Sequence, residues 1–299
     1  WLDPRYGDVV HKFRPIGTFW AQAVTASAAG ADDARNITVY RIPSMIAVTL
    51  AVLALYWLSL PLIGATPAFL AAGLFAAAPL TAIVGTLAIA DGLALLPATV
   101  ATLALMRIYC AGENEDTGKL SLIFWIAVGF GLLVNALHTP ILVATTLIAL
   151  FVMERDLSWL RRLRLFPGIL IALLLAAPWL YVRHLQDGIP FSGMTGQAFL
   201  AALGGAQDMK LRAFPGTFLL AAILGFLPGT ALLAPALKKL WDERQTRLPK
   251  FLFAWIAGYI IYLELISSKP GTYTVQVMFP AFAIAIASTI LKRVPPPTR

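Results

Sequence analysis

Charged and reactive side chains are scarce in this sequence. Only 13% of its 299 residues are charged, against about 25% in soluble domains, which argues against a soluble globular protein. The one cysteine, Cys110, excludes an internal disulfide, and only three histidines are present. Paired cysteines, clustered histidines, the His-Glu-x-x-His motif and the glycine-rich nucleotide-binding motifs are absent. We therefore expect neither a metal site nor a cofactor.

Long apolar runs take the place of charge. Hydrophobic residues make up 59% of the chain, the mean hydropathy is +0.79, and segments long enough to cross a bilayer recur along the whole chain. Leucine and alanine dominate these runs, and the polar–apolar alternation of outer-membrane barrel strands is missing. The sequence therefore predicts an all-α integral membrane protein, a polytopic bundle of about nine transmembrane helices. The predicted spans are 42–60, 66–84, 91–109, 120–137, 139–153, 167–185, 216–237, 250–266 and 273–291.

Two further stretches favour helices that lie along the membrane surface. In residues 15–30, apolar side chains recur near helical spacing, as is typical of an interfacial helix. These apolar positions are Ile16, Phe19, Trp20 and Val24. Residues 193–205 show a weaker form of the pattern, and a connecting or re-entrant helix explains them equally well.

Basic residues gather on one side of the nine-span arrangement. The net charge is +8, and the basic clusters in residues 154–165, 238–250 and 292–299 all fall on the same face. By the positive-inside rule this face is cytoplasmic, and because no soluble basic domain is present we expect no nucleic-acid partner. The predicted division is an outer-face loop with the interfacial helix at 1–41, a transmembrane bundle at 42–291 with an outer-face loop at 186–215, and a cytoplasmic tail at 292–299.

The first twenty residues carry the most specific motif. WLDPRYGDVVHKFRPIGTFW (1–20) joins W-L-x-P-R to R-P-I-G-x-F-W through a short spacer. Four more segments follow it: VYRIPS (39–44), AIADGLALLPATVATLALM (88–106), APWLYV (177–182) and KPGTYTVQVMFPAFAIA (269–285). Taken in this order along nearly the whole chain, they resemble the aminoarabinose-transferase and protein-mannosyltransferase-like glycosyltransferases.

The resemblance implies a GT-C fold and an activity that depends on a polyprenyl phosphate. We expect a membrane glycosyltransferase that moves a sugar from an undecaprenyl-phosphate-type donor to an acceptor, either a lipid A-like lipid or a protein. The reaction would take place on the periplasmic face of a bacterial inner membrane, with the C-terminus in the cytoplasm. A transporter is disfavoured because it needs polar residues in mid-span, and these spans contain few.

Departures from the family pattern keep a second interpretation open. Arg14 stands where the family has lysine, Phe13 replaces an acidic residue, and Thr272 occupies a histidine position. The family's first span and its D-E-x-x-R-Y helix, which carries the carboxylate that serves as base, would precede Trp1. The chain starts there without methionine and lacks the family's C-terminal soluble domain, so we expect its N-terminus to be processed or incomplete. The alternative is a catalytically inactive homologue, a structural or accessory subunit among neighbouring membrane subunits.

Cations on the outer face are the candidates for binding the donor phosphate. The departing phosphate gathers negative charge, which preorganised cations stabilise, and arginine offers it a bidentate fork. The resemblance indicates Arg14 first, then Lys12 and Lys269. The predicted topology places Arg41 on the same face as a fourth candidate. By spacing alone, Arg14 could equally be an interfacial cation that contacts lipid headgroups.

An acceptor hydroxyl or amine needs a general base within hydrogen-bond reach. Asp8 and Asp91 are the carboxylates on the outer side. Asp91 also occupies the acidic position of its family segment, although it could equally cap a helix. Three further candidates are His138, Glu264 and Tyr273. His138 could mark the start of a helix instead, and Glu264 could pair with a nearby lysine or face a cavity.

Overall fold

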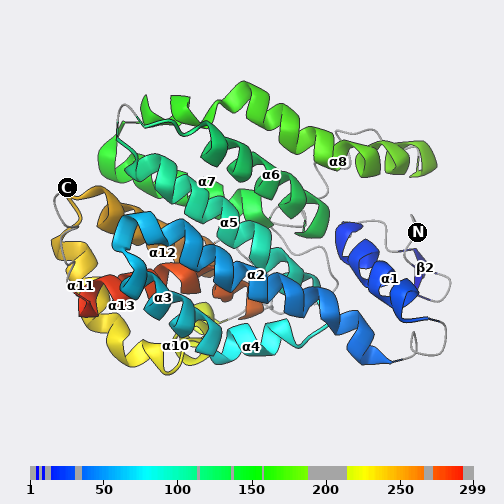
Figure 1. Ribbon diagram of the computed structural model, residues 1–299, viewed down its shortest axis with the longest axis horizontal. Helices are drawn as coiled ribbons and strands as arrows, with labels where there is room; N and C mark the ends of the chain where they lie inside the picture. The colour runs from blue at the N-terminus through cyan, green and yellow to red at the C-terminus, as the bar shows by residue number, and fades with distance from the viewer. Residues whose placement is uncertain are drawn as a thin grey trace.

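Most of the long helices run side by side along the long axis of the molecule (Figure 1). The computed structural model describes residues 5–6, 9–10, 15–30, 36–112, 115–135, 138–156, 158–187, 214–265 and 272–291. Two short strands, β1 (Arg5–Tyr6) and β2 (Val9–Val10), pair antiparallel ahead of the first helix. The helices are α1 (Gly17–Ala29), α2 (Ile37–Ile63), α3 (Ala65–Ala77), α4 (Pro79–Gly85), α5 (Ala90–Cys110), α6 (Gly118–Asn135), α7 (His138–Glu154), η2 (Ser158–Leu163), α8 (Leu165–Asp187), α10 (Thr217–Gly225), η3 (Gly229–Leu232), α11 (Leu233–Asp242), α12 (Arg247–Leu265), η4 (Thr272–Met278) and α13 (Phe279–Ile290).

The apolar helices coincide with the predicted spans. Five helical segments of the described chain are long and apolar enough to cross a membrane, namely α2, α5, α6, α12 and the η4–α13 segment. Two bent pairs raise this number to as many as seven, because α3 meets α4 at 65° and α10 meets the η3–α11 segment at 106°. The two remaining predicted spans coincide with shorter apolar helices, α7 and residues 165–177 of α8. The predicted all-α membrane bundle is confirmed.

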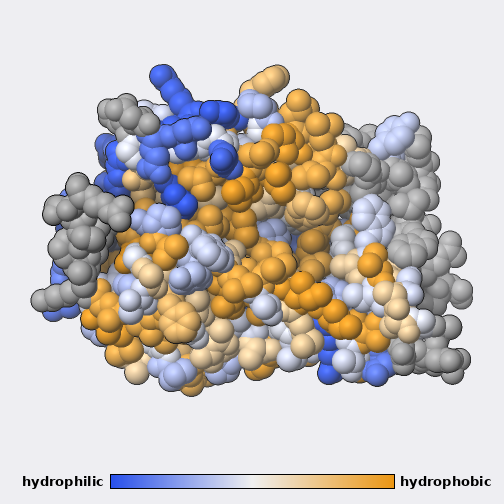
Figure 2. Space-filling view, in the orientation of Figure 1, coloured by the Kyte–Doolittle hydropathy of each residue, from blue (hydrophilic) through white to orange (hydrophobic). Residues whose placement is uncertain are grey.

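Apolar residues cover much of the visible surface of the molecule (Figure 2). On the face shown in Figure 2, hydrophobic residues cover the middle, and hydrophilic residues gather at the end where α7 runs into η2. Large apolar side chains point outward from the helices, among them Trp57 (64% exposed), Phe69 (73%) and Phe166 (86%). Exposed apolar surface of this extent is typical of a protein surrounded by lipid.

Small residues allow α5 to lie at the centre of the bundle. This helix packs against both α2 and α6, and Ala94, Ala98 and Ala101 on it are fully buried. A Cβ atom on Gly92 would lie 2.7 Å from the carbonyl oxygen of Val84, so only glycine fits at this point. Close backbone approach through small side chains is the usual way in which helices associate in lipid.

The first helix, α1, is attached to the end of the bundle where α5 begins. The Thr18 hydroxyl donates a hydrogen bond to the carbonyl oxygen of Val134 at 3.2 Å, near the end of α6. The Gln22 amide donates to the carbonyl oxygen of Ala88, also at 3.2 Å, just ahead of α5. Of its four apolar positions, Val24 stays 59% exposed and is therefore free to contact lipid. A helix is present where the sequence predicts one, and its place at the outer membrane surface stays a prediction.

Two predicted spans are broken rather than continuous. The segment GFLPG (225–229) joins the end of α10 to the start of η3, and Pro79 begins α4 after the single residue Ala78 that follows α3. Proline lacks the backbone N–H group and clashes with the preceding turn, which ends or redirects a helix. Other predicted features lie outside the described residues: the weaker interfacial helix at 193–205, most of the loop at 186–215, and the tail at 292–299.

Candidate functional site

The structure describes five of the nine predicted site residues. They are Arg41, Asp91, His138, Glu264 and Tyr273. The other four, Asp8, Lys12, Arg14 and Lys269, fall outside the described residues. The described residues come from α2, α5, α7, α12 and η4, which bring them toward one end of the bundle.

Asp91 lies in the first turn of α5 and is held by two amides. The Asn135 side-chain amide donates a hydrogen bond to its Oδ1 atom at 3.1 Å. The Gln276 side-chain amide donates to its backbone carbonyl oxygen, also at 3.1 Å. The residue that precedes α5 is Ile89, and no side chain caps this helix, so Asp91 is not its N-cap. A carboxylate in the first turn is nevertheless stabilised by the positive end of the helix dipole.

His138 begins α7 and contacts a buried tyrosine. Its Nε2 atom is 2.9 Å from the hydroxyl oxygen of Tyr259 in α12, and Tyr259 is only 1% exposed. Asn135, three residues earlier, ends α6 and reaches Asp91. The end of α6 therefore holds an amide against the carboxylate, and the start of α7 holds an imidazole against the tyrosine. We group these contacts of α5, α6, α7 and α12 as one polar cluster.

Gln276 completes this polar cluster from η4. The residue is fully buried, and its amide nitrogen binds the backbone of Asp91. Within the described residues, its Oε1 atom accepts no hydrogen bond. Buried polar atoms are nearly always paired in folded proteins. Among the described residues this oxygen is therefore an exceptional acceptor, close to the start of α5.

Glu264 binds backbone rather than a described cation. Its two carboxylate oxygens accept hydrogen bonds from the backbone N–H groups of Gly216 at 2.7 Å and Leu219 at 2.9 Å. These N–H groups lie at the start of α10, where a helix leaves donors unpaired and favours negative charge. Glu264 therefore fastens the end of α12 to the start of α10.

Arg41 lies near the same end of the bundle as Asp91. It is one turn before Ser44, whose hydroxyl donates a hydrogen bond to the carbonyl oxygen of Ile89 at 3.4 Å. A shallow, mostly apolar groove follows on α2, lined by Met45, Ile46, Thr49 and Leu50. Tyr273, the fifth described candidate, is 36% exposed in η4.

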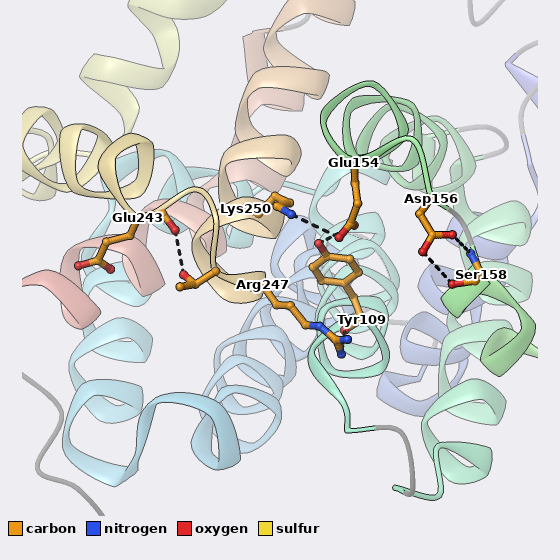
Figure 3. A network of polar contacts seen from close by, with 8 residues as sticks. Tyr109, Glu154, Asp156, Ser158, Glu243, Arg247 and Lys250 are labelled. Carbon is orange, nitrogen blue, oxygen red and sulfur yellow. Dashed lines mark hydrogen bonds and ion pairs between the residues drawn. The ribbon is translucent and has the colours of Figure 1, made fainter.

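A second polar cluster occupies the opposite end of α5, α7 and α12 (Figure 3). The Tyr109 hydroxyl donates a hydrogen bond to Glu154 Oε2 at 2.9 Å, and the Lys250 ammonium group lies 3.3 Å from Glu154 Oε1. None of its three residues was a candidate from the sequence. It ties three helices together at the basic end of the molecule.

The same end contains a hydrogen-bonded turn between α7 and η2. The backbone N–H group and the hydroxyl of Ser158 donate to the two carboxylate oxygens of Asp156 at 2.8 and 2.9 Å. Both hydrogen bonds favour the ionised carboxylate, the backbone bond most strongly, and they lower the pKa of Asp156 below its ordinary value.

Asn135, Tyr259 and Gln276 are the cluster residues that the sequence analysis missed. Each is a polar side chain within or at the end of an otherwise apolar segment. Such residues are costly in a membrane and often functional, and this signal could have found them. Among the described residues, no group of three or more histidine, cysteine, aspartate or glutamate side chains could hold a metal ion.

Comparison with known proteins decides the family. Residues 13–182 match the family described as dolichyl-phosphate-mannose-protein mannosyltransferase, which is more than half of the chain. The chain belongs to this family. Among curated relatives, the undecaprenyl phosphate-alpha-4-amino-4-deoxy-L-arabinose arabinosyl transferase of Aeromonas hydrophila is 26% identical over 296 residues. The match covers 97% of this chain and 52% of that protein, so the chain spans about half the length of this relative.

Solved structures of the same fold agree with this assignment. ArnT from Cupriavidus metallidurans, bound to undecaprenyl phosphate, superimposes with a TM-score of 0.83 at 18% identity, over 97% of this chain and 52% of that one. The archaeal oligosaccharyltransferase AglB from Archaeoglobus fulgidus, in complex with an inhibitory peptide and a dolichol-phosphate, gives 0.60 at 15% identity, over 93% and 42%. The predicted GT-C fold and glycosyltransferase family are confirmed. The membrane-spanning helices and the bacterial relatives support a multi-pass protein of the inner membrane.

Proposed function

We propose that this chain takes part in the transfer of a sugar from a polyprenyl-phosphate donor to an acceptor at the Asp91 end of the bundle. The observation that carries this proposal is the carboxylate of Asp91, which is fixed by Asn135 through Oδ1 and by Gln276 through its backbone. Solved proteins of the same fold hold undecaprenyl phosphate or a dolichol-phosphate. A donor of this class is therefore the one that we assign.

Asp91 is suited to receive a proton or to hold an acceptor amine. Its Oδ2 atom accepts no hydrogen bond within the described residues, whereas Oδ1 is bound by Asn135. A carboxylate with one fixed and one free oxygen can accept the proton of an attacking hydroxyl group as the bond to the sugar forms. The Asn135 amide keeps the carboxylate in one orientation, which is the usual requirement for such a base.

The leaving phosphate requires positive charge close by. Among the candidate cations, Arg41 is the one whose position the structure describes. The groove lined by Met45, Ile46, Thr49 and Leu50 begins one turn farther along α2. A phosphate beside Arg41 would leave its isoprenoid chain against apolar side chains. Arg14, Lys12 and Lys269 stay candidates through the resemblance, and Asp8 stays the second candidate base.

We further propose that the Asp91 end faces the periplasm and the basic end faces the cytoplasm. The cations of η2, α11 and α12 support this orientation through the positive-inside rule. In this arrangement residues 1–41 lie outside the membrane, residues 42–291 form the bundle, and residues 292–299 end in the cytoplasm.

Donor binding and turnover, measured separately on the full-length protein in nanodiscs, test the proposal. Titration with undecaprenyl phosphate should saturate, and Arg41→Gln should weaken it about tenfold, or about 1.4 kcal/mol. Asp91→Asn should leave donor binding unchanged but lower transfer from polyprenyl-phosphate sugars by about 100-fold or more, as expected for a general base. Matched controls are Arg155→Gln and Asp116→Asn, which remove the same charges from exposed positions at the other end.

Each possible outcome has a distinct meaning. If Arg41→Gln leaves the affinity for undecaprenyl phosphate unchanged, Arg41 is not part of the phosphate site. Arg14, Lys12 and Lys269 are then the residues to substitute next. Normal transfer by Asp91→Asn would eliminate Asp91 as the base. Saturable donor binding without transfer to any acceptor would favour the accessory-subunit alternative.

A further inference from the structure

Two arginines at the basic end of the bundle converge on one carbonyl oxygen. Arg162 in η2 and Arg247 at the start of α12 each donate a hydrogen bond from a terminal guanidinium nitrogen to the carbonyl oxygen of Ala111, both at 2.8 Å. Ala111 follows the last turn of α5 and is 3% exposed. Because both nitrogens contact the same oxygen, these two nitrogens lie no farther apart than twice that distance.

Three described carboxylates at this end of the bundle are paired with other cations. These ion pairs are Glu154–Lys250 at 3.3 Å, Asp116–Arg164 at 3.7 Å and Glu115–Arg107 at 3.9 Å. Across the described residues, neither Arg162 nor Arg247 takes part in an ion pair. In the view of Figure 3, the guanidinium group of Arg247 lies on the far side of the Tyr109 ring from the Glu154–Lys250 pair. Among the residues that the structure describes, these two adjacent cations therefore have no counter-ion.

Capping of α5 accounts for one of these arginines but not for both. Arg247 alone reaches two carbonyl oxygens at the end of α5, that of Ala111 and that of Tyr109 at 3.4 Å, and its charge complements the negative end of the helix dipole. A second guanidinium group adds like-charge repulsion, which an anion between the two would relieve. Each guanidinium group has five N–H donors in a planar fork that matches phosphate oxygens. Arg247 is exposed and Arg162 is partly exposed, so donors remain accessible from outside.

We propose that Arg162 and Arg247 form a phosphate-binding site at the basic end of the bundle. The site joins elements from three parts of the chain: the end of α5, η2 and the start of α12. Basic pockets between transmembrane helices at this level bind the headgroups of anionic lipids. The ligand is therefore the phosphodiester of an anionic membrane lipid, or a soluble phosphate of the same chemistry. The site is separate from the Asp91 cluster and does not depend on the proposed transfer reaction.

Lipid titration of the full-length, detergent-solubilised protein tests this site. Phosphatidylglycerol should bind saturably, and zwitterionic phosphatidylcholine should not compete with it. The double variant Arg162→Gln/Arg247→Gln should weaken phosphatidylglycerol binding at least tenfold. The control variant Arg161→Gln/Lys238→Gln removes the same charge from two exposed positions at the same end and should bind like the wild type. Inorganic phosphate, titrated alone, distinguishes a soluble ligand from a lipid.

Several results decide the matter. If both double variants weaken phosphatidylglycerol binding equally, the loss reflects only the change in net charge, and the proposed site is overturned. Wild-type affinity in the Arg162→Gln/Arg247→Gln protein overturns it as well. Saturable binding of inorganic phosphate that this variant loses supports the site and identifies a soluble ligand. If the glutamine variant does not fold, Arg162→Lys/Arg247→Lys keeps the charge but removes the fork, and the proposal then requires a several-fold loss of affinity.

Discussion

The Glu154–Lys250 pair provides the sharpest test of how the basic end is held together. The Lys250 side chain is only 13% exposed and that of Glu154 29%. At their separation of 3.3 Å, an effective dielectric constant of about 20 gives a Coulomb attraction of roughly 5 kcal/mol. Desolvation of both groups cancels much of this gain. We therefore expect a coupling free energy of about 2 kcal/mol.

A double-mutant cycle measures this coupling directly. The variants are Glu154→Gln, Lys250→Met and the two combined, each unfolded by titration with SDS in mixed micelles. Glu154→Gln alone should lower the free energy of unfolding by about 2–3 kcal/mol, because it leaves Lys250 charged and poorly solvated and weakens the Tyr109 hydrogen bond.

The Arg164–Asp116 pair is the matched control for this cycle. Its side chains are 62% and 80% exposed at a separation of 3.7 Å, so its coupling should stay below about 1 kcal/mol. If the two pairs gave the same coupling free energy, the reasoning from burial would be refuted.

Two further predictions follow from contacts elsewhere in the structure. Gly168→Ala should lower the free energy of unfolding by about 1–3 kcal/mol, because the new Cβ atom would overlap the ring of Trp125. The Trp125 ring nitrogen donates a hydrogen bond to the Leu163 carbonyl oxygen, so the substitution should also shift the tryptophan fluorescence. Gly73→Ala, in a helix with open space around the glycine, is the control and should not destabilise the protein; an equal loss would contradict the packing argument. Ser158→Ala should raise the pKa of Asp156 partway toward its ordinary 3.8, since the backbone N–H bond remains. In the wild type, the stabilisation from this turn is present above pH 3.8 and is lost as the pH falls through the lowered pKa of Asp156. If the substitution leaves the NMR titration of the Asp156 carboxyl group unchanged, the assignment is refuted.

Hydropathy was sufficient to predict the positions of the membrane helices but not their bends. Each of the nine predicted spans contains an apolar helix or a bent pair, because burial in lipid imposes a length and a composition that can be recognised in the sequence. The 106° bend before α11 depends on how the segment GFLPG (225–229) packs. A proline and two glycines permit a bend there without specifying its angle.

The candidate site was predicted only in part for a related reason. Asp91 was a candidate because of its place in a motif, whereas Asn135 and Gln276 became partners only when α6 and η4 came next to α5. Contacts between helices far apart in the sequence leave no periodic pattern. The Tyr109–Glu154–Lys250 cluster was missed for this reason too, since its members are separated by many residues.

The length of α5 determines how deep each polar cluster lies in the bilayer. Asp91 is in its first turn and Tyr109 in its last, and at about 1.5 Å per residue they are roughly 27 Å apart along the helix. The hydrocarbon layer of a membrane is about 30 Å thick. If α5 stands nearly upright, both clusters therefore lie close to the edges of the hydrocarbon layer, one in each leaflet. A polyprenyl-phosphate donor could then bring its phosphate to Asp91 without leaving its own leaflet, and the Arg162–Arg247 pair would meet the phosphates of the other.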